Sequence, residues 1–237
     1  MTYQRKEIIG DCTLYLGDCL EILPVLGGGL RVATDPPYGI SLKPLRGLTK
    51  AIANDGRAEA QALWRDVLEI VTPKLAEDSG HIFWTGWSET WTKELLSEFL
   101  KVKSCIVWAK NMFGIGYYTR PQHEFAWYCH KGKPPVPEKA ESDLWNIPKV
   151  QAPVHSCEKP VALMERCIKL CGGDYFLDPF MGVGATGIAC ANLDRKFIGI
   201  ELDPKYFDIA CRRIEEAYKQ PDLFIEPPKK IKQEAFI

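Results

Sequence analysis

The sequence lacks several features that would point to particular classes of protein. None of its nine cysteines forms a C-x-x-C pair, and their odd number and scattered positions argue against a disulfide framework or a zinc site. No apolar run approaches the length of a membrane-spanning helix, and the opening residues MTYQRKEIIGDC contain no apolar signal core. We therefore expect free thiols, no metal, no membrane association and a location in a reducing cytoplasm.

The sequence also lacks an excess of charge of either sign. The net charge is −1, so there is no global basic signature of a nucleic-acid-binding protein. The charge is uneven, however, because residues 101–139 hold seven Lys or Arg against two acidic residues, and residues 40–57 hold four against one. Such basic stripes either face a polyanion or form ordinary solvated faces, and both interpretations remain open.

Short β-rich segments alternate with helical patterns along most of the 237 residues, which predicts a single α/β domain with a doubly wound, mainly parallel sheet. The expected strands cover residues 12–16, 30–34, 80–86, 104–109, 123–129, 175–180 and 196–202. The expected helices cover residues 18–26, 58–75, 88–100, 160–171, 186–193 and 206–218. Two loop-like stretches, residues 40–57 and the proline-rich residues 131–154, interrupt the alternation and are candidates for function.

The first motif lies at the end of a predicted strand in the C-terminal third, YFLDPFMGVGATG. The strand ends at Asp178, a turn with Gly182 and Gly184 follows, a helix begins near Thr186, and the next strand ends at Glu201. Glycines permit close backbone approach, a helix start offers free N–H groups, and an acid after the second strand can accept from ribose hydroxyls. The spacing is not G-x-G-x-x-G, which disfavours a dinucleotide site; a plain strand–helix turn is the alternative.

The second motif, RVATDPPYGI at residues 31–40, ends a predicted strand with Asp35, Pro36, Pro37 and Tyr38. Two consecutive prolines end a strand because neither can donate a ladder hydrogen bond, and each restricts its neighbour. The motif therefore places a carboxylate, a rigid bend and an aromatic ring together. If the strands of the two motifs are neighbours at the switch point of the sheet, Asp35 and Asp178 face one crevice.

Both motifs resemble those of amino-DNA methyltransferases, in which TDPPY matches the catalytic D/N/S-P-P-Y/F motif and DPFMGVGATG matches the cofactor motif. HSCEKPVALMERCI, YLGDCLEILPVL, RPQHEFAWYCHKGKP and SDLWNIPK resemble further family segments, so the resemblance spans residues 12–218. The catalytic motif precedes the cofactor motif, as in the circularly permuted β-type group. The resemblance implies a Rossmann-like methyltransferase fold, S-adenosyl-L-methionine as cofactor and double-stranded DNA as partner.

The resemblance also divides the single domain, residues 1–237, into functional parts. The catalytic half covers about residues 12–130, a short target-recognition segment about 131–154, the cofactor-binding half about 155–218, and a tail 219–237. It implies a prokaryotic or phage-encoded protein that acts in the cytoplasm. A monomer and a homodimer both remain open, as does a cognate restriction nuclease.

In the catalytic motif, the resemblance implies that a flipped-out base presents its exocyclic amino group to Asp35. Asp35 accepts one N–H group, the carbonyl of Pro36 accepts the other, and Tyr38 stacks on the base, while Pro37 helps to fix the bend. Stacking offsets part of the cost of extruding the base. Positioning and electrostatics dominate, and Asp35 need not act as a strong base.

For the cofactor, the resemblance implies that Lys159 pairs with the methionine carboxylate, Glu201 with the ribose and Asp18 with the adenine end. It also implies that Asp178 and Phe180 lie near the methionine half and that Gly182 and Gly184 line the turn. Asp35 and Thr186 complete the expected cofactor residues. Val183 and Ala185 stand where the family usually has Ser or Thr, so backbone N–H groups must carry more of the binding.

Asp at the first catalytic position favours adenine N6 as the target, with cytosine N4 as the alternative. A cytosine C5 enzyme is disfavoured because no Pro-Cys dipeptide occurs. A catalytically inert nucleic-acid-binding relic and a NAD-binding enzyme are the alternatives of other kinds. His123 and Glu124 have no partner ligands nearby in the sequence, so no metal pair is expected there. The expected DNA contacts are basic or aromatic loop residues: Lys43, Arg46, Tyr117, Tyr118, Arg120, Lys131 and Lys133.

Overall fold

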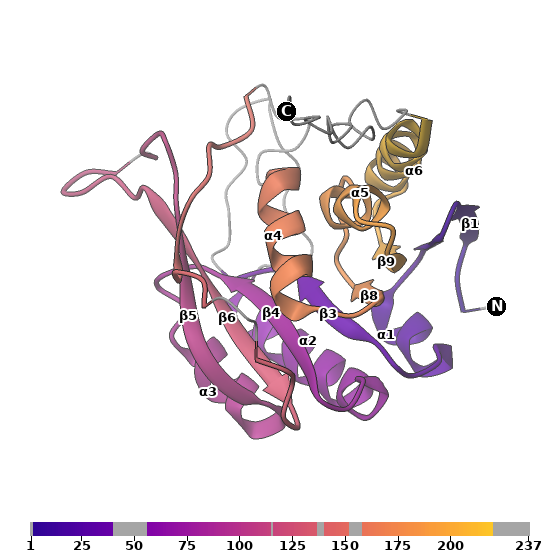
Figure 1. The fold of residues 1–237 in the computed structure, drawn as a ribbon, viewed down its shortest axis with the longest axis horizontal. Helices are drawn as coiled ribbons and strands as arrows, with labels where there is room; N and C mark the ends of the chain where they lie inside the picture. Colours follow the sequence, from indigo (N-terminus) through magenta and orange to yellow (C-terminus); the bar gives the residue numbers. More distant parts are fainter. Residues whose placement is uncertain (1, 40–55, 115, 137–139, 152–157, 220–237) are drawn as a thin grey trace, which may run out of the picture.

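The computed structural model describes residues 2–39, 56–114, 116–136, 140–151 and 158–219. Within them, nine strands form one sheet in the order β1-β2-β9-β8-β3-β4-β6-β5-β7 (Figure 1). The strands are β1 Arg5–Ile9, β2 Cys12–Leu16, β3 Arg31–Thr34, β4 Ser79–Thr85, β5 Lys101–Ala109, β6 His123–Lys131, β7 Leu144–Asn146, β8 Tyr175–Asp178 and β9 Lys196–Glu201. The α-helices are α1 Cys19–Ile22, α2 Arg57–Val71, α3 Trp91–Phe99, α4 Val161–Cys171, α5 Ala185–Asn192 and α6 Pro204–Lys219. Two 3₁₀ turns, Leu23–Val25 and Thr72–Lys74, extend α1 and α2.

The middle of the sheet is parallel, from β2 through β9, β8 and β3 to β4. The strands β1 and β6 pair antiparallel with its two sides, β5 pairs antiparallel with β6, and β7 returns parallel to β5. All seven residues of β4 are buried, as expected for a central strand covered on both faces. The mainly parallel α/β sheet is therefore confirmed.

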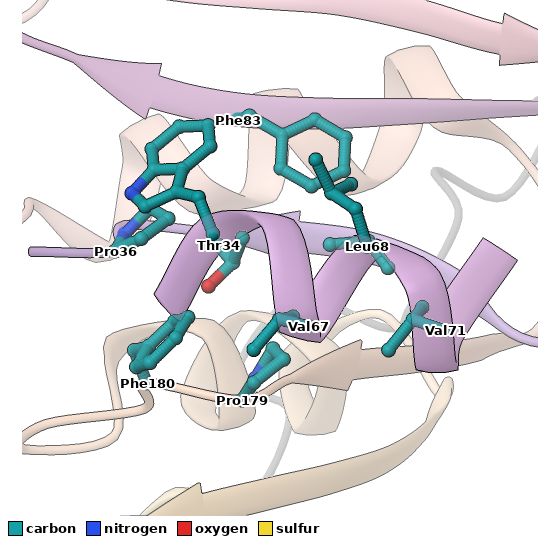
Figure 2. A pocket seen from close by; sticks show the side chains of 10 residues that line it. Thr34, Pro36, Val67, Leu68, Val71, Phe83, Pro179 and Phe180 are labelled. Atoms are coloured by element: carbon teal, nitrogen blue, oxygen red, sulfur yellow. The ribbon is translucent and has the colours of Figure 1, made fainter. Parts of the chain in front are cut away.

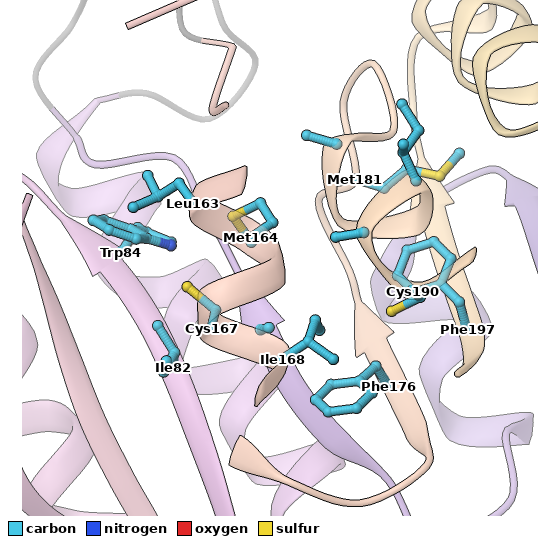
Figure 3. Packing of buried hydrophobic residues seen from close by; sticks show 14 of the residues in the cluster. Ile82, Trp84, Leu163, Met164, Cys167, Ile168, Phe176, Met181, Cys190 and Phe197 are labelled. Carbon is cyan, nitrogen blue, oxygen red and sulfur yellow. The ribbon is translucent and has the colours of Figure 1, made fainter. Parts of the chain in front are cut away.

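Helices cover both faces of the sheet, and each face has its own core. The first core joins α4, α5 and α6 to the sheet, and the second joins α1, α2 and α3 to the opposite face (Figure 1). Successive strand residues alternate between the two, so that Trp84 and Phe176 enter the first core while Phe83 and Leu177 enter the second. Figure 3 shows the first core, where α4 packs between Trp84 of β4 and Phe176 of β8.

The switch point lies between β8 and β3. From β8 the chain passes through α5 to β9, on one side, and from β3 it passes through α2 to β4, on the other. The connections after the two strands lead to opposite sides, which is the arrangement that places a ligand site at the carboxyl ends of such strands. The prediction that the two motif-bearing strands are neighbours is confirmed by their parallel pairing.

The predicted elements are present, but two strands were not expected. Strand β1 forms a hairpin with β2, in which Ile9 pairs with Cys12 and Gly10 and Asp11 make the turn. Most residues of β1 are exposed. Strand β7 spans only Leu144–Asn146, in a stretch predicted as loop. Its three residues are too few for a periodic pattern, and their pairing with β5 is a tertiary contact.

The eight cysteines in the described part of the chain are all free, and six of them are buried. Among the described residues, no helix combines the length and the apolar composition needed to cross a bilayer.

Candidate active site

Four acidic side chains line one edge of the sheet, although they are far apart in the sequence. Glu201 and Asp178 end β9 and β8, and Asp18 and Asp35 follow β2 and β3 closely. These four strands are consecutive and parallel, so their carboxyl ends meet at the same edge. The structure thus brings the two sequence motifs together, as the strand-end argument predicted.

The turn after β3 is held by its own tyrosine and by α2. The Tyr38 hydroxyl donates to Oδ1 of Asp35, three residues earlier. The indole N–H of Trp64 on α2 donates to the Pro37 carbonyl at 2.9 Å. Because the prolines also restrict the backbone, the carboxylate and the aromatic ring have a fixed relative position.

Lys159 is buried at this turn, only 7% exposed, rather than lying at the surface. Its Nζ lies 2.5 Å from Oδ2 of Asp35 and 3.1 Å from the Tyr38 hydroxyl. It also lies 5.6 Å from the centre of the Trp84 ring. The structure therefore places the Lys159 ammonium on the catalytic carboxylate, while its pairing with a methionine carboxylate stays a prediction.

Burial and ion pairing act in opposite directions on these groups. Burial raises the pKa of Asp35 above its ordinary value, against the opposing effect of the Lys159 charge. Burial alone would lower the pKa of Lys159, but the carboxylates of Asp35 and Glu124 outweigh it and raise that pKa. Lys159 is therefore a permanent cation beside Asp35 at any physiological pH.

Glu124, at the start of β6, is a site residue that the sequence analysis missed. Its Oε2 lies 3.0 Å from Nζ of Lys159, and its Oε1 pairs with Lys110. Burial would raise the pKa of Glu124, but the two lysines lower it to about 2. His123 beside it stacks on Phe125, and the described residues hold no group of metal-ligating side chains. No motif could have revealed Glu124, because its partners come from other elements.

Asp178 organises the turn after β8. Its buried carboxylate accepts from the hydroxyls of Thr34 and Thr186, each at 2.6 Å, and from the N–H of Phe180 at 3.1 Å. Burial raises the pKa of Asp178 to about 6 although these donors oppose the shift. Asp178 and Thr186 thus shape the turn and connect it to β3.

The two glycines of this turn are required for different reasons. Both have left-handed backbones, with φ of +53° at Gly182 and +85° at Gly184. A Cβ at Gly184 would lie 3.0 Å from the Cβ of Ala210 on α6, whereas a Cβ at Gly182 would meet no atom within 4 Å. Gly184 therefore permits helix packing, and Gly182 leaves open space at the turn. Val183 is buried, so the residue that replaces the family's hydroxyl packs in the core.

Glu201 and Asp18 flank the open side of this turn. Glu201 accepts from the N–H groups of Gly182 at 2.9 Å and Asp203 at 2.8 Å, and burial raises its pKa to about 7. Asp18 is exposed and caps α1 by accepting from the N–H of Leu20 at 2.9 Å. An acidic rim beside open space at Gly182 fits a ligand that offers hydroxyl groups.

An apolar pocket lies under both turns, between α2 and the ends of β3 and β8 (Figure 2). Its lining combines catalytic-turn and cofactor-turn residues with the second core: Val32, Thr34, Pro36, Trp64, Val67, Leu68, Val71, Phe83, Pro179 and Phe180. Phe180, predicted to lie near the methionine half of the cofactor, is partly buried here. The pocket gives the two turns a shared apolar floor.

The segment between β5 and β6 lies at the same edge of the sheet as Asp35, and it extends away from the body of the molecule (Figure 1). Tyr117 and Tyr118 on it are 93% and 94% exposed. The Arg120 guanidinium lies 4.6 Å from the centre of the Phe113 ring. These aromatic and basic groups are free to meet a partner beside the catalytic turn.

The other predicted DNA contacts are not brought to this edge. Lys131 ends β6 opposite Ser79, the first residue of β4, so it lies at the far edge of the sheet, where it pairs with Glu77. The backbone N–H of Lys133 donates to Asp78 at that same edge. They were expected at the site because they begin the segment predicted to recognise the target, but the antiparallel pairing of β6 with β4 carries them to the opposite edge. Lys43 and Arg46 lie outside the described residues.

Comparison with known proteins identifies close relatives of this arrangement. The model of the DNA methylase family named N6_N4_Mtase matches residues 31–212. The type II methyltransferase M.HinfI of Haemophilus influenzae is 34% identical over 289 aligned residues, which cover 94% of this chain and 76% of that protein.

Solved structures share the fold. The M1.HpyAVI–SAM complex superimposes with a TM-score of 0.68 at 26% identity, covering 86% of this chain and 99% of that one. The PvuII DNA methyltransferase, described as cytosine-N4-specific, gives a TM-score of 0.71 at 17% identity and covers 91% of this chain and 95% of that one. At that identity the second likeness concerns the fold alone.

Proposed function

The chain belongs to the N6-adenine/N4-cytosine family of amino-DNA methyltransferases, and from this premise we propose that it methylates adenine N6 in double-stranded DNA. The observation that carries the proposal is the contact between the two turns. Thr34, directly before Asp35, donates to Asp178 at 2.6 Å, so a methyl donor at one turn and an amino group at the other are neighbours. Asp35 as the first residue of the catalytic turn favours adenine.

The cofactor is S-adenosyl-L-methionine, whose sulfonium supplies an activated methyl group. The turn after β8 fits it, because Gly182 leaves space for a ligand and the Glu201 carboxylate can accept from ribose hydroxyls. Asp18 would border the adenine end, and Phe180 would contact the methionine half. Asp178 acts indirectly, by holding the turn through Thr186.

The catalytic turn orients the acceptor. An exocyclic amino nitrogen is a poor nucleophile because its lone pair is delocalised into the ring. When Asp35 accepts one N–H and the Pro36 carbonyl the other, the nitrogen becomes more tetrahedral and its lone pair points to the methyl group. Tyr38 offers its ring to the base, and Trp64 fixes the turn by holding the neighbouring Pro37 carbonyl. The turn thus contributes position and electrostatic stabilisation.

The target base must leave the duplex to reach this turn. The exposed aromatic residues between β5 and β6, chiefly Tyr117 and Tyr118, lie at the edge of the sheet that carries Asp35. There they would stack on bases or fill the space that the flipped-out base leaves in the duplex. Arg120 would contact phosphate. In a bacterial cell such an enzyme would act on the DNA of the cytoplasm.

The proposal is tested by incubating the purified protein with mixed-sequence duplex DNA and S-adenosyl-L-methionine carrying a labelled methyl group. Nucleosides from the digested DNA are then identified by mass spectrometry. We expect labelled N6-methyladenine with the parent protein and none with Asp35→Ala, although that variant still binds the cofactor in a calorimetric titration.

The products discriminate the alternatives. Labelled N4-methylcytosine would assign the chain to the other branch of the family and refute adenine as the target. A folded parent protein that binds cofactor and DNA but never transfers the label would be an inert relative of the enzymes.

A further inference from the structure

Both carboxylate oxygens of Asp35 already have hydrogen-bond donors. Tyr38 donates to Oδ1, and Lys159 donates to Oδ2 at 2.5 Å. Each oxygen can accept a second donor, but a target amino group that donates an N–H to Asp35 competes with the donor already seated on that oxygen, most of all with an ammonium at 2.5 Å. Tyr38 belongs to the same rigid turn, whereas Lys159 reaches the site from the start of α4, so Lys159 is the donor that can be displaced.

Displacing Lys159 has a cost, because its ammonium is buried. A buried ion pair that loses one partner leaves an uncompensated charge, which is strongly unfavourable. The rings of Tyr38 and Trp84 lie 5.5 Å and 5.6 Å from the Nζ, and they favour a cation nearby without neutralising it. The ammonium therefore needs a second carboxylate within reach.

Glu124 is that carboxylate. Its Oε2 lies 3.0 Å from the Lys159 Nζ, and its side chain is 23% exposed. It comes from β6, so it does not move with the catalytic turn. Its other oxygen is held by Lys110, which follows β5 and helps to keep Glu124 in place.

We propose that Glu124 is a positioning residue that keeps the Lys159 ammonium paired when the target amino group takes Oδ2 of Asp35. The inference rests on the proposed reaction at Asp35 and goes beyond it by giving Lys159 and Glu124 distinct parts. In the free enzyme the ammonium is shared between two carboxylates. With the base bound it is carried by Glu124, and the Asp35 oxygen accepts the amino N–H.

The same geometry predicts how Glu124 affects the ionisation of Asp35. The ionisable groups that face Asp35 are Lys159 before α4, Glu124 on β6, Tyr38 on its own turn and Asp178 on β8. The negative charge of Glu124 raises the pKa of Asp35, and Lys159 lowers it. Replacing Glu124 by an uncharged isostere removes the negative charge that raises the pKa of Asp35. The Lys159 ammonium then pairs with Asp35 alone, so the pKa of Asp35 falls.

The test compares Glu124→Gln with Glu158→Gln. Glu158 is the matched control because it is also buried, is next to Lys159 in the chain and pairs with Arg213 on α6 at 2.6 Å. For Glu124→Gln we expect kcat to fall about tenfold or more, because the amino group now competes with a tighter Asp35–Lys159 pair. We also expect the acid limb of the kcat profile to move to lower pH, because the pKa of Asp35 falls when the charge of Glu124 is removed.

A measurement without cofactor or DNA accompanies the kinetics. The Asp35 carboxyl is followed by ¹³C NMR during a pH titration of the protein labelled at aspartate, with Asp35→Asn assigning the signal. Its pKa is expected to fall in Glu124→Gln and to stay at the parent value in Glu158→Gln. Glu124→Asp keeps the negative charge, so the acid limb of its kcat profile is expected to lie close to that of the parent. The uncharged Glu124→Met replaces Glu124→Gln if that variant does not fold.

The inference is overturned if Glu124→Gln leaves both kcat and the Asp35 titration at the parent values, or if Glu158→Gln changes them equally. If the parent protein transfers no methyl group at all, the proposed function fails instead, and the Asp35 titration still decides whether Glu124 controls this carboxylate.

Discussion

His81 should lower the free energy of unfolding in acid, by an amount that can be calculated from the surroundings of its ring. It lies on β4, fully buried, and its Nδ1 accepts from the backbone N–H of Val32 on β3 at 3.1 Å. Its Nε2 lies 2.9 Å from the Ser79 hydroxyl, which itself donates to the carbonyl of Ala76. This network requires a neutral ring with the proton on Nε2. Protonating Nδ1 would break the contact with β3, the strand that leads to Asp35.

Burial, followed by the charge of Arg31, lowers the pKa of His81 to about 3 from the ordinary 6.5. The unfolded chain therefore binds a proton below about pH 6.5 that the folded chain excludes, and the free energy of unfolding falls as the pH decreases. Between pH 7.5 and pH 5 this one residue should cost about 2 kcal/mol. Asp178 and Glu201, whose pKa values are raised, act in the opposite direction in this range, so the test is a difference between variants.

The assay is urea unfolding followed by tryptophan fluorescence at both pH values. His81→Gln keeps an acceptor and a donor but cannot be protonated, so its pH-dependent loss should be about 2 kcal/mol smaller than that of the parent. Ser79→Ala is the control, because it weakens the network at both pH values but leaves the histidine. Equal pH dependence in the parent and His81→Gln would refute the reasoning.

Three further predictions concern the two turns. Burial raises the pKa of Glu201 to about 7, so this carboxylate is protonated as the pH falls and should then bind the cofactor less well. We expect an affinity about tenfold weaker at pH 6 than at pH 8.5, and calorimetry of Glu201→Gln should show no such dependence. Gly184→Ala should lower the free energy of unfolding by about 2–3 kcal/mol, through left-handed strain plus the clash with α6. Gly182→Ala should lower it by about 1–2 kcal/mol but weaken cofactor binding more, and equal effects of the two variants in thermal denaturation and calorimetry would contradict these roles. Trp64→Phe removes the donor to the Pro37 carbonyl and should lower the free energy of unfolding by about 1 kcal/mol. It should also lower kcat and leave the cofactor affinity unchanged, and an unchanged kcat would show that this hydrogen bond does not position the turn.

The positions of the two motifs could be predicted from the sequence because both depend on local rules. Asp35 and Asp178 each follow an apolar segment and precede residues that cannot continue a strand, so each was expected at a strand end. In a parallel sheet, strand ends meet at one edge, which the pairing of β3 with β8 confirms. The left-handed glycines of the second motif follow from the same local chemistry.

The pairing of Lys159 with Glu124 could not be predicted, because it depends on the order of strands on the far side of β4. Glu124 faces the site only because β6 runs antiparallel beside β4, which brings its first residues to the catalytic edge. The same reversal carries Lys131, which was itself an expected DNA contact, to the opposite edge of the sheet. Neither charge belongs to a spaced motif, so both outcomes required the tertiary structure.

In the proposed reaction, the turn at Asp35 presents a base amino group for methylation. Single-molecule sequencing of modified bases tests this role in the genomic DNA of a host that lacks its own DNA methyltransferases and expresses this chain. We expect N6-methyladenine at one recurring sequence with the parent protein and none with Asp35→Ala produced at the same level. Unmodified DNA with the folded parent protein, or equal modification with the Asp35→Ala variant, would contradict the account.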